Sequence, residues 1–310
     1  MRGENRGRGI SIRNRAFSGL LMALSVALAA VLWILATSPE TSSQDREGPS
    51  EFKGPALKVF FIDVGQGDGM LVQTPGGKNI LIDTGPDERA VPGFLRGRGV
   101  KNIEVLVTTH PHSDHIGGAV AVLQSWPVKR IYDSGKPHAS PIYERYLERV
   151  KQLVKDGQTV FRRARGGDRI EVEPGLAMEV VHPSEPLPDD PNNASVVLRL
   201  TYGRVSFLLT GDIGREAEGD ILKRKFGVRA DILKVGHHGS RTSTSAGFLE
   251  RVGPKVAVIQ SGRGNDYGHP HRETLQRLER QGARIYRNDR DGTILVATDG
   301  DKYAVTRMGR

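Results

Sequence analysis

Three histidines and one aspartate fall within six residues of this chain, and their side chains suit metal binding: His110, His112, Asp114 and His115. Imidazole nitrogens and carboxylate oxygens are the ligands that Zn²⁺ and similar cations prefer. The apolar run at 103–107 predicts a strand that delivers these residues to a loop at the edge of a sheet. Packing four such groups in a core without a partner would cost too much desolvation energy. We therefore predict a metal site here; the alternative is a solvated, histidine-rich loop.

Other acidic and histidine residues also follow short apolar runs. Asp83 directly follows the apolar run 80–82. Asp212 comes after the run 207–209 with two residues between them, and the pair His237 and His238 comes after the run 232–235. Asp212 also suits the N-cap of a helix, which would be a structural role. Of the two adjacent histidines, we predict that His237 is the ligand.

In this order the motifs resemble the five signatures of the metallo-β-lactamase superfamily. Three further runs resemble more closely the hydrolase domain at the C-terminus of the ComEC/Rec2-type DNA-uptake channels: Asp-Val-Gly-Gln-Gly-Asp at 63–68, His-His-Gly-Ser at 237–240, and Asn-Asp-Tyr-Gly-His-Pro-His at 265–271. The resemblance covers about residue 57 to residue 306. It implies a mixed α/β fold, the αββα sandwich, in which two sheets pack face to face and helices cover both outer faces.

The resemblance also implies a role for each signature residue and one or two divalent ions, Zn²⁺ or Mn²⁺. It assigns His110 and His112 to a first metal; Asp114, His115 and His237 to a second; and Asp212 to a bridge between the two. Asp83 would organise the metal loop through hydrogen bonds. The catalytic set is then Asp83, Asp114 and Asp212, with His269 as a candidate general acid.

One signature departs from the pattern. Most relatives place a histidine about twenty residues before the bridging aspartate, whereas this chain has Asn192 and Asn193 there. An amide oxygen is a weaker and harder ligand than imidazole. The first metal would then bind weakly, be Mn²⁺ rather than Zn²⁺, or be absent. His182 is a possible replacement ligand, or else an ordinary capping or surface residue.

Residues around the predicted metals are candidates for substrate contacts. They are Asp63, Gln66 and Asp68 on a glycine-rich turn, Asn193, Ser240 and Thr242 on phosphate-type loops, and His271. The structural alternatives are a tight turn with solvated acids and a pair of surface histidines. The basic run Arg162, Arg163, Arg165 and Arg169 could follow a polyanion backbone or be solvated.

Composition limits the partners and the chemistry. The 310 residues carry a net charge of +9, and residues 51–310 hold 39 Lys and Arg against 32 Asp and Glu. This balance favours a polyanionic substrate such as DNA, or an anionic lipid surface. The chain has no cysteine. Thiolate zinc sites, a cysteine nucleophile and disulfides are therefore excluded.

The N-terminal segment predicts a membrane anchor. Residues 16–37 are uncharged and apolar, long enough to cross a membrane, and five arginines precede them. We predict a cytoplasmic basic tail at 1–15, a single-pass signal anchor at 16–37, a flexible linker at 38–54 and a hydrolase domain at 55–310 outside the cytoplasm. A cleavable signal peptide is the alternative. One apolar segment cannot form a transport pore, so a role in DNA uptake would need a separate membrane partner; oligomeric state is left open.

The rest of the chain alternates between short apolar strands and amphipathic helices. We predict strands at 57–63, 70–73, 79–83, 103–108, 178–182, 195–202, 205–209, 232–235, 256–260, 284–287 and 292–298. Helices are predicted at 90–98, 116–124, 141–155, 216–226, 245–252 and 273–281.

Together these patterns predict a membrane-anchored, metal-dependent hydrolase outside the cytoplasm, foremost a phosphodiesterase or nuclease. One alternative is a hydrolase of another bond on the same fold, such as a lactone, a β-lactam or a wall-polymer phosphoester. The other is a surface-anchored binding module with a degenerate metal site.

Overall fold

A computed structural model of the chain describes Phe52 and residues 55–224 and 226–309, all within one compact unit. The predicted tail, membrane anchor and linker lie outside the described residues, apart from Phe52. None of the described helices is both long and apolar enough to span a membrane.

The first sheet has eight strands, and its topology changes from antiparallel to parallel along the sheet. The order is β14 (Tyr303–Arg307), β13 (Ile294–Thr298), β1 (Leu57–Phe61), β2 (Gly69–Gln73), β3 (Asn79–Thr84), β4 (Ile103–Thr108), β5 (Val128–Asp133) and β6 (Val160–Arg163). Neighbours from β14 to β3 are antiparallel, and those from β3 to β6 are parallel.

The second sheet has six strands with the same change of direction. The order is β12 (Arg284–Arg287), β11 (Val256–Ile259), β10 (Ile232–Lys234), β9 (Val205–Leu209), β8 (Val197–Tyr202) and β7 (Leu176–His182). The four strands from β12 to β9 are parallel, and β8 and β7 add antiparallel neighbours. Each half of the fold therefore has a group of parallel strands whose C-terminal loops can share one site.

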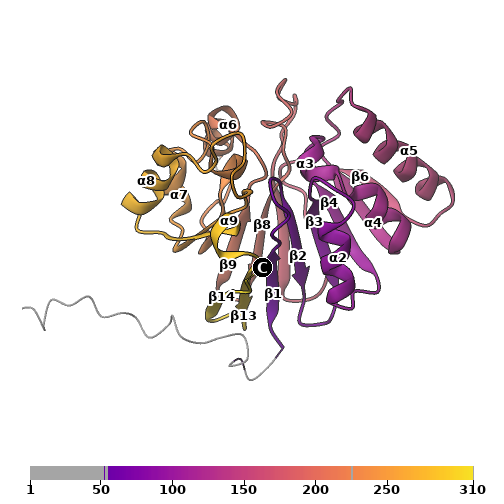
Figure 1. The fold of residues 1–310 in the computed structure, drawn as a ribbon, viewed down its shortest axis with the longest axis horizontal. Coiled ribbons are helices and arrows are strands. Elements are labelled where there is room, and N and C mark those ends of the chain that lie inside the picture. Colours follow the sequence, from indigo (N-terminus) through magenta and orange to yellow (C-terminus); the bar gives the residue numbers. More distant parts are fainter. Residues whose placement is uncertain (1–51, 53–54, 225, 310) are drawn as a thin grey trace, which may run out of the picture. The chain divides into compact units, whose positions relative to one another are not determined.

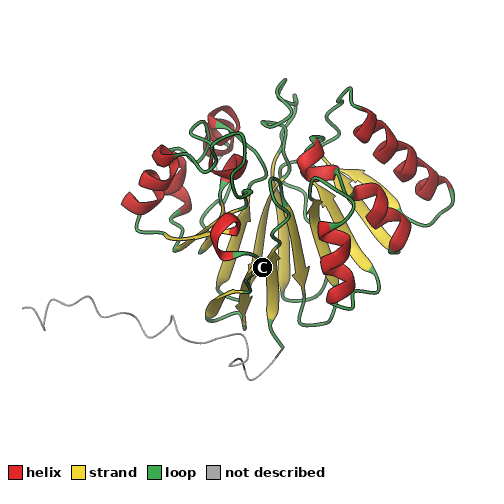
Figure 2. Ribbon diagram, viewed as in Figure 1, coloured by secondary structure: helices red, strands yellow, loops and turns green. Residues whose placement is uncertain are grey.

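Helices cover the outer face of each sheet (Figures 1 and 2). The first sheet carries α2 (Ala90–Gly97), α4 (Ala119–Ser125) and α5 (Pro141–Lys155), and the second carries α6 (Arg215–Lys223), α7 (Ala246–Val252) and α8 (Arg272–Arg280). Shorter turns are α3 (Ser113–Ile116), η3 (Gly236–Gly239) and α9 (Asn288–Asp291). The predicted mixed α/β sandwich of two sheets between helical layers is confirmed.

Side chains that alternate along each strand form the apolar layers on the two faces of a sheet. In β1, Val59 and Phe61 join the core between the sheets, where they meet residues such as Leu200 and Phe207 of the second sheet. Phe60, between them in sequence, faces the helical side instead. Successive side chains of a strand point to opposite faces, so one strand can serve two apolar layers.

The predicted helix at 116–124 is divided in the structure. It becomes α3 and α4, separated at Gly117 and Gly118. A Cβ atom on Gly117 would lie only 2.1 Å from the backbone oxygen of Pro86. This close approach of two backbones requires glycine and fixes α3, which carries two of the predicted ligands.

Candidate metal centre

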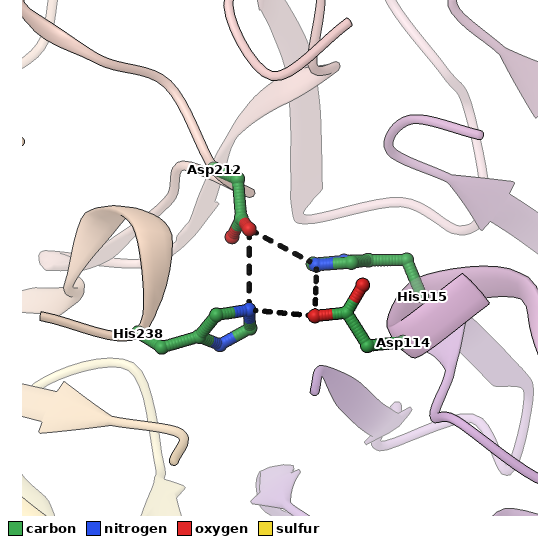
Figure 3. Close-up of side chains that lie close together, drawn as sticks. All are labelled: Asp114, His115, Asp212 and His238. Carbon is green, nitrogen blue, oxygen red and sulfur yellow. Dashed lines mark hydrogen bonds and ion pairs between the residues drawn. The ribbon is translucent and has the colours of Figure 1, made fainter. Parts of the chain in front are cut away.

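Four side chains converge where the loops of the two sheets meet. Asp114, His115, Asp212 and His238 each present one ligand atom, and these atoms all lie within 4.8 Å of one another (Figure 3). Nε2 of His238 is 3.1 Å from Oδ2 of both Asp114 and Asp212. Nε2 of His115 is 3.2 Å from Oδ2 of Asp212. We call this group the second-metal side.

Each half of the fold contributes two of these side chains. Asp114 and His115 lie on α3, directly after β4, while Asp212 follows β9 and His238 lies in η3 after β10. Gly211, with φ of 53°, makes the turn before Asp212, whose backbone N–H then donates to Ser195 Oγ at 3.2 Å. The centre therefore forms only when the two sheets pack together.

Outer hydrogen bonds fix both histidine rings. Nδ1 of His115 lies 2.8 Å from Oδ2 of Asp83, which also accepts hydrogen bonds from the backbone N–H and hydroxyl of Thr109, each at 2.7 Å. Nδ1 of His238 donates to the backbone oxygen of Gln260 at 2.9 Å. With Nδ1 held in this way, Nε2 of each ring points toward Asp212, as metal-binding histidines require.

The donor set fits a divalent cation. Nε2 of His115 and Oδ1 of Asp212 are buried without a hydrogen-bond partner among the described residues. Burial by itself lowers the pKa of His115 and His238, but the neighbouring carboxylates, Asp212 first, outweigh it and raise both pKa values well above 6.5. Such a site favours positive charge, and two imidazole nitrogens with two carboxylates suit Zn²⁺ or Mn²⁺.

A second group, the first-metal side, lies next to Asp212. Nε2 of His110 is 3.1 Å from Nδ1 of His112 and 4.0 Å from Oδ2 of Asp212. Nε2 of His237 is 3.9 Å from the same Asp212 oxygen. Asp212 therefore lies between the two groups, where a bridging carboxylate would have to be.

Comparison with known proteins identifies the family. The model of the family described as "Metallo-beta-lactamase superfamily" matches residues 62–263. The chain belongs to this superfamily. Its mixed α/β sandwich with a cluster of histidines and aspartates is that of a metallo-hydrolase of the superfamily.

The curated relatives confirm the resemblance to the ComEC/Rec2-type domain. The chain is 32% identical to "ComE operon protein 3" of Bacillus subtilis over 92% of its own length and 37% of that protein. It is 31% identical to "Recombination protein 2" of Haemophilus influenzae, covering 81% of the chain and 30% of that protein. It is 34% identical to "Competence protein ComA" of Neisseria gonorrhoeae, covering 75% and 31%. The chain thus spans about a third of the length of these relatives.

Solved structures share the fold at low sequence identity. Igni18, a metallo hydrolase from Ignicoccus hospitalis, matches with a TM-score of 0.53 and 17% identity over 77% of this chain and 98% of that one. CmlA, a diiron β-hydroxylase from Streptomyces venezuelae, matches with a TM-score of 0.50 and 13% identity, covering 74% and 52%.

The geometry favours His238, not the predicted His237, as the donor on the second-metal side. The His238 side chain is 1% exposed and held by Gln260, whereas that of His237 is 29% exposed and lies farther from Asp212. Both residues have positive φ angles, 47° and 53°, so a left-handed turn directs the second ring inward. We therefore assign His238 to the second-metal side and His237 to the first-metal side.

The asparagines at the third signature have different surroundings. Oδ1 of Asn193 accepts the backbone N–H of Gly214, and its Nδ2 donates to Asp190 and Glu216. These bonds make Asn193 a brace of the loop. Asn193 also lines a hollow beside Asp212, so the substrate contact stays a prediction. Oδ1 of Asn192, in contrast, is buried without a hydrogen-bond partner among the described residues, and Asn192 lines the cleft beside Asp212.

His182 does not replace the absent histidine. The residue is 1% exposed, and its Nε2 lies 2.7 Å from the backbone oxygen of Asn193, to which it donates. His182 therefore stabilises the loop of Asn192 and Asn193 through the backbone of Asn193.

A buried ion pair between Lys234 and Asp68 lies next to the donor Asp212, and the sequence patterns did not predict it. Lys234 and Asp68 are both fully buried, and Nζ of Lys234 contacts Oδ2 of Asp68, lies 3.6 Å from Oδ1 of Asp212, and donates to the backbone oxygen of Gly211 at 3.0 Å. Burial alone would raise the pKa of Asp68, but the Lys234 ammonium together with His115 and His238 outweighs burial and holds that pKa below its usual range. Asp68 is therefore a support of the centre, not the predicted substrate contact. The lysine at the end of the short buried strand β10 was the available signal.

Two hollows open beside the donors and share Asn192, Asp212 and His237 as walls. One, of about 360 Å³, is also lined by Gln66, His138, Tyr267 and His269 among others. The other, of about 620 Å³, includes Arg215, Arg241 and Thr242. We call them the aromatic arm and the arginine arm of the cleft.

Several predicted substrate residues lie elsewhere. Asp63 lines a separate hollow with Arg263. Ser240 is largely buried and shares a hydrogen bond of 2.9 Å with the Thr242 hydroxyl, while Nδ1 of His271 accepts the backbone N–H of Arg241. Ser240 and His271 therefore shape the loop that presents Thr242. Of the predicted substrate residues, Gln66, Asn193 and Thr242 line the cleft.

Two other expectations change on electrostatic grounds. Burial, assisted by the neighbouring His238, lowers the pKa of His269 to about 4, so this ring has no proton to give as a general acid at neutral pH. In the predicted basic run, Nε of Arg165 lies 2.6 Å from Oε1 of Glu185, and its Nη1 donates to the backbone of Ser134. Arg165 is therefore already engaged within the fold.

Proposed function

We propose that this metallo-hydrolase is a phosphodiesterase, with DNA or a related polyanion as its substrate. The observation that carries the proposal is the position of the donor group at the meeting point of two hollows, one of which has two arginines on its wall. Cations together with guanidinium groups suit a phosphodiester, whose charge sits on its non-bridging oxygens. A neutral lactone would gain nothing from the arginines.

Asp114, His115, Asp212 and His238 would hold one cation, and His110, His112 and Asp212 the other, completed by His237 or Asn192. When bound, the cations would supply Lewis-acid chemistry, polarising a phosphoryl oxygen and lowering the pKa of water to about 7. The chain supplies orientation: Asp83 and the Gln260 carbonyl hold the two rings of the second-metal side. Lys234 offsets part of the negative charge of Asp68 and Asp212 from below.

The location belongs to the same proposal. The arginine-rich residues 1–15, followed by the apolar 16–37, support a single-pass anchor with the hydrolase domain outside the cytoplasm. Protease added to intact cells should then digest the C-terminal domain and spare the N-terminal tail. Protection of the entire chain would refute this topology. The names of two relatives refer to competence and recombination, which supports DNA as the substrate and a separate membrane partner for uptake.

A substrate panel tests the proposed activity. The full chain, purified in detergent, is assayed with bis-p-nitrophenyl phosphate, DNA, RNA and a β-lactam after loading with Mn²⁺ or Zn²⁺. We expect turnover of the phosphodiesters, and a loss of at least about 1,000-fold in Asp212→Asn, because the carboxylate shared by both metal sides is gone. Asp156→Asn, at the exposed end of α5, is the matched control and should keep full activity.

Two results would count against the phosphodiesterase. Hydrolysis of the β-lactam without turnover of any phosphodiester would move the assignment to a different bond. Metal content far below one ion per chain, measured by mass spectrometry, would favour the binding module.

A further inference from the structure

The aromatic arm of the cleft carries an exposed ring in a fixed position. Tyr267 is 66% exposed, and its ring stacks on His269 with a centroid distance of 5.7 Å and an interplanar angle of 20°. Among the described residues it is the most exposed of the large apolar side chains. An aromatic ring held flat at the wall of a cleft offers a stacking surface to a planar ligand.

The loop that carries Tyr267 is tied back at its base. The Asn265 side chain donates to the backbone oxygens of Gly262 and His269, at 2.8 and 2.6 Å, and accepts the backbone N–H of His269 at 2.9 Å. Gln66, from the first half of the fold, accepts the N–H of Gly262. The ring is therefore presented by a braced loop, which reduces the entropy that a ligand must offset when it stacks there.

The arginine arm is separated from the aromatic arm by the residues that line both, Asn192, Asp212 and His237. Arg215 and Arg241 are exposed, and neither guanidinium forms an ion pair with any described residue; Arg215 Nη2 donates only to the backbone oxygen of Arg241, at 3.4 Å. Asp190 and Glu273 line the same hollow, but Asp190 is already bonded to Asn193. Two unpaired guanidinium groups next to the Thr242 hydroxyl suit phosphate oxygens.

We propose that the cleft binds single-stranded nucleic acid, with one base stacked on Tyr267 and the adjoining backbone phosphates at Arg215 and Arg241. The strand would then cross Asp212, which both hollows share. Inside a duplex both faces of each base are covered by its stacked neighbours, so an internal base can stack on Tyr267 only in a single strand. This inference rests on the proposed phosphodiesterase activity for the reaction that follows binding, but binding itself can be tested separately.

Binding is measured by fluorescence anisotropy with the full chain and a ten-nucleotide phosphorothioate strand, which resists cleavage, as DNA and as RNA. Tyr267→Ala should weaken binding of the single strand by about tenfold, the scale on which loss of one stacked base acts. Tyr267→Trp keeps a ring and should bind like the wild type. A duplex of the same sequence should bind more weakly than the single strand and respond less than twofold to Tyr267→Ala.

The role of the arginine arm is tested by measuring how the affinity for the strand depends on salt concentration. Arg215→Ser with Arg241→Ser should weaken binding of the single strand and reduce the slope of log affinity against log salt by about 1.4, about 0.7 for each lost phosphate contact. Arg251→Ser with Arg280→Ser removes the same charge from exposed positions on α7 and α8 that line neither arm. This control should leave the slope within about 0.5 of the wild type.

Two readouts separate this inference from the proposed activity. Diester turnover is measured with the wild-type chain, whereas Tyr267→Ala is compared with the wild type only in binding of the uncleavable strand. If Tyr267→Ala binds the single strand within twofold of the wild type, or if duplex and single strand bind and respond alike, the inference is wrong even where the diester is hydrolysed. Absence of diester turnover with intact strand binding would instead refute only the phosphodiesterase.

Discussion

The second-metal side and the first-metal side share Asp212 but differ in how their ligands are held. On the second-metal side, His115 and His238 are almost fully buried, and each has its Nδ1 fixed by a strong acceptor, the Asp83 carboxylate or the Gln260 carbonyl. On the first-metal side, His112 and His237 are partly exposed, and Nδ1 of His110 has only the Thr109 hydroxyl, at 3.2 Å.

The electrostatics differ in the same direction. Carboxylates raise the pKa of His115 and His238, whereas burial, with less compensation, lowers the pKa of His110, His112 and His237. The second-metal side is thus prepared for a cation by fixed rings and negative charge. The first-metal side has less firmly fixed rings and less negative charge, and an asparagine occupies the position where the third signature has a histidine. We expect the second-metal side to fill first as metal is added.

The largest expected effect is a pH dependence confined to one side. In the metal-free protein the raised pKa of His115 and His238 keeps both rings protonated at neutral pH, so a cation must displace two protons. Affinity of the second-metal side should therefore rise with pH, by up to about 100-fold per unit between about pH 6.5 and 8. The histidines of the first-metal side, with lowered pKa values, are already neutral there and should show little change.

Competition with a chelating indicator, followed across this pH range, measures both sides. The reverse pattern, with proton release on the weaker side only, would contradict the electrostatic difference between them.

The next effect distinguishes the two adjacent histidines. His238→Ala should weaken the tighter site by at least about 100-fold, because even outer partners of a ligand are worth 10- to 100-fold. His237→Ala should leave that site within about threefold and weaken only the looser one. Zn²⁺ stoichiometry and affinity by calorimetry give the readout, with circular dichroism to show that both variants fold. Equal losses in the two variants would mean that the sides are not separate.

The adjacent histidines also show where sequence patterns stop being informative. The sandwich was expected from the resemblance to the superfamily. The position of each signature residue at the end of a strand followed from apolar runs, whose spacing is local. The bounds of β4, β9, β12 and α5 agree with the prediction. Which of two neighbouring rings points inward depends on the left-handed turn in η3, and no periodicity in the sequence encodes that turn.

Two of the strands that were missed, β5 and β6, have a common physical cause. β5 and β6 carry Lys129, Arg130, Arg162 and Arg163 within four to six residues, so they lack the apolar character of a core strand. They form because their backbones continue the parallel sheet beyond β4. Asp68 was misplaced for a related reason, since a carboxylate on a glycine-rich turn is normally solvated, and only the distant Lys234 makes its burial tolerable.

The smallest predicted effect would reduce the difference between the two sides. Asn192→His supplies an imidazole where the third signature of the superfamily has one, and Asn192 already lines the cleft with an unpartnered Oδ1. The backbone N–H of this residue donates to Asp190 Oδ1 at 3.0 Å, a bond that the substitution leaves in place. We expect the looser site to bind Zn²⁺ about tenfold more tightly, the lower end of what one change around a metal is worth.

The neighbouring position provides the control for this substitution. Asn193→His removes three hydrogen bonds of a buried carboxamide and should lower the free energy of unfolding by about 1–3 kcal/mol without tightening either site. Calorimetric titration with Zn²⁺ and thermal unfolding separate the two outcomes. If Asn192→His leaves the looser site unchanged, the side chain at 192 does not reach the cation. The first-metal side must then be completed by His237 alone.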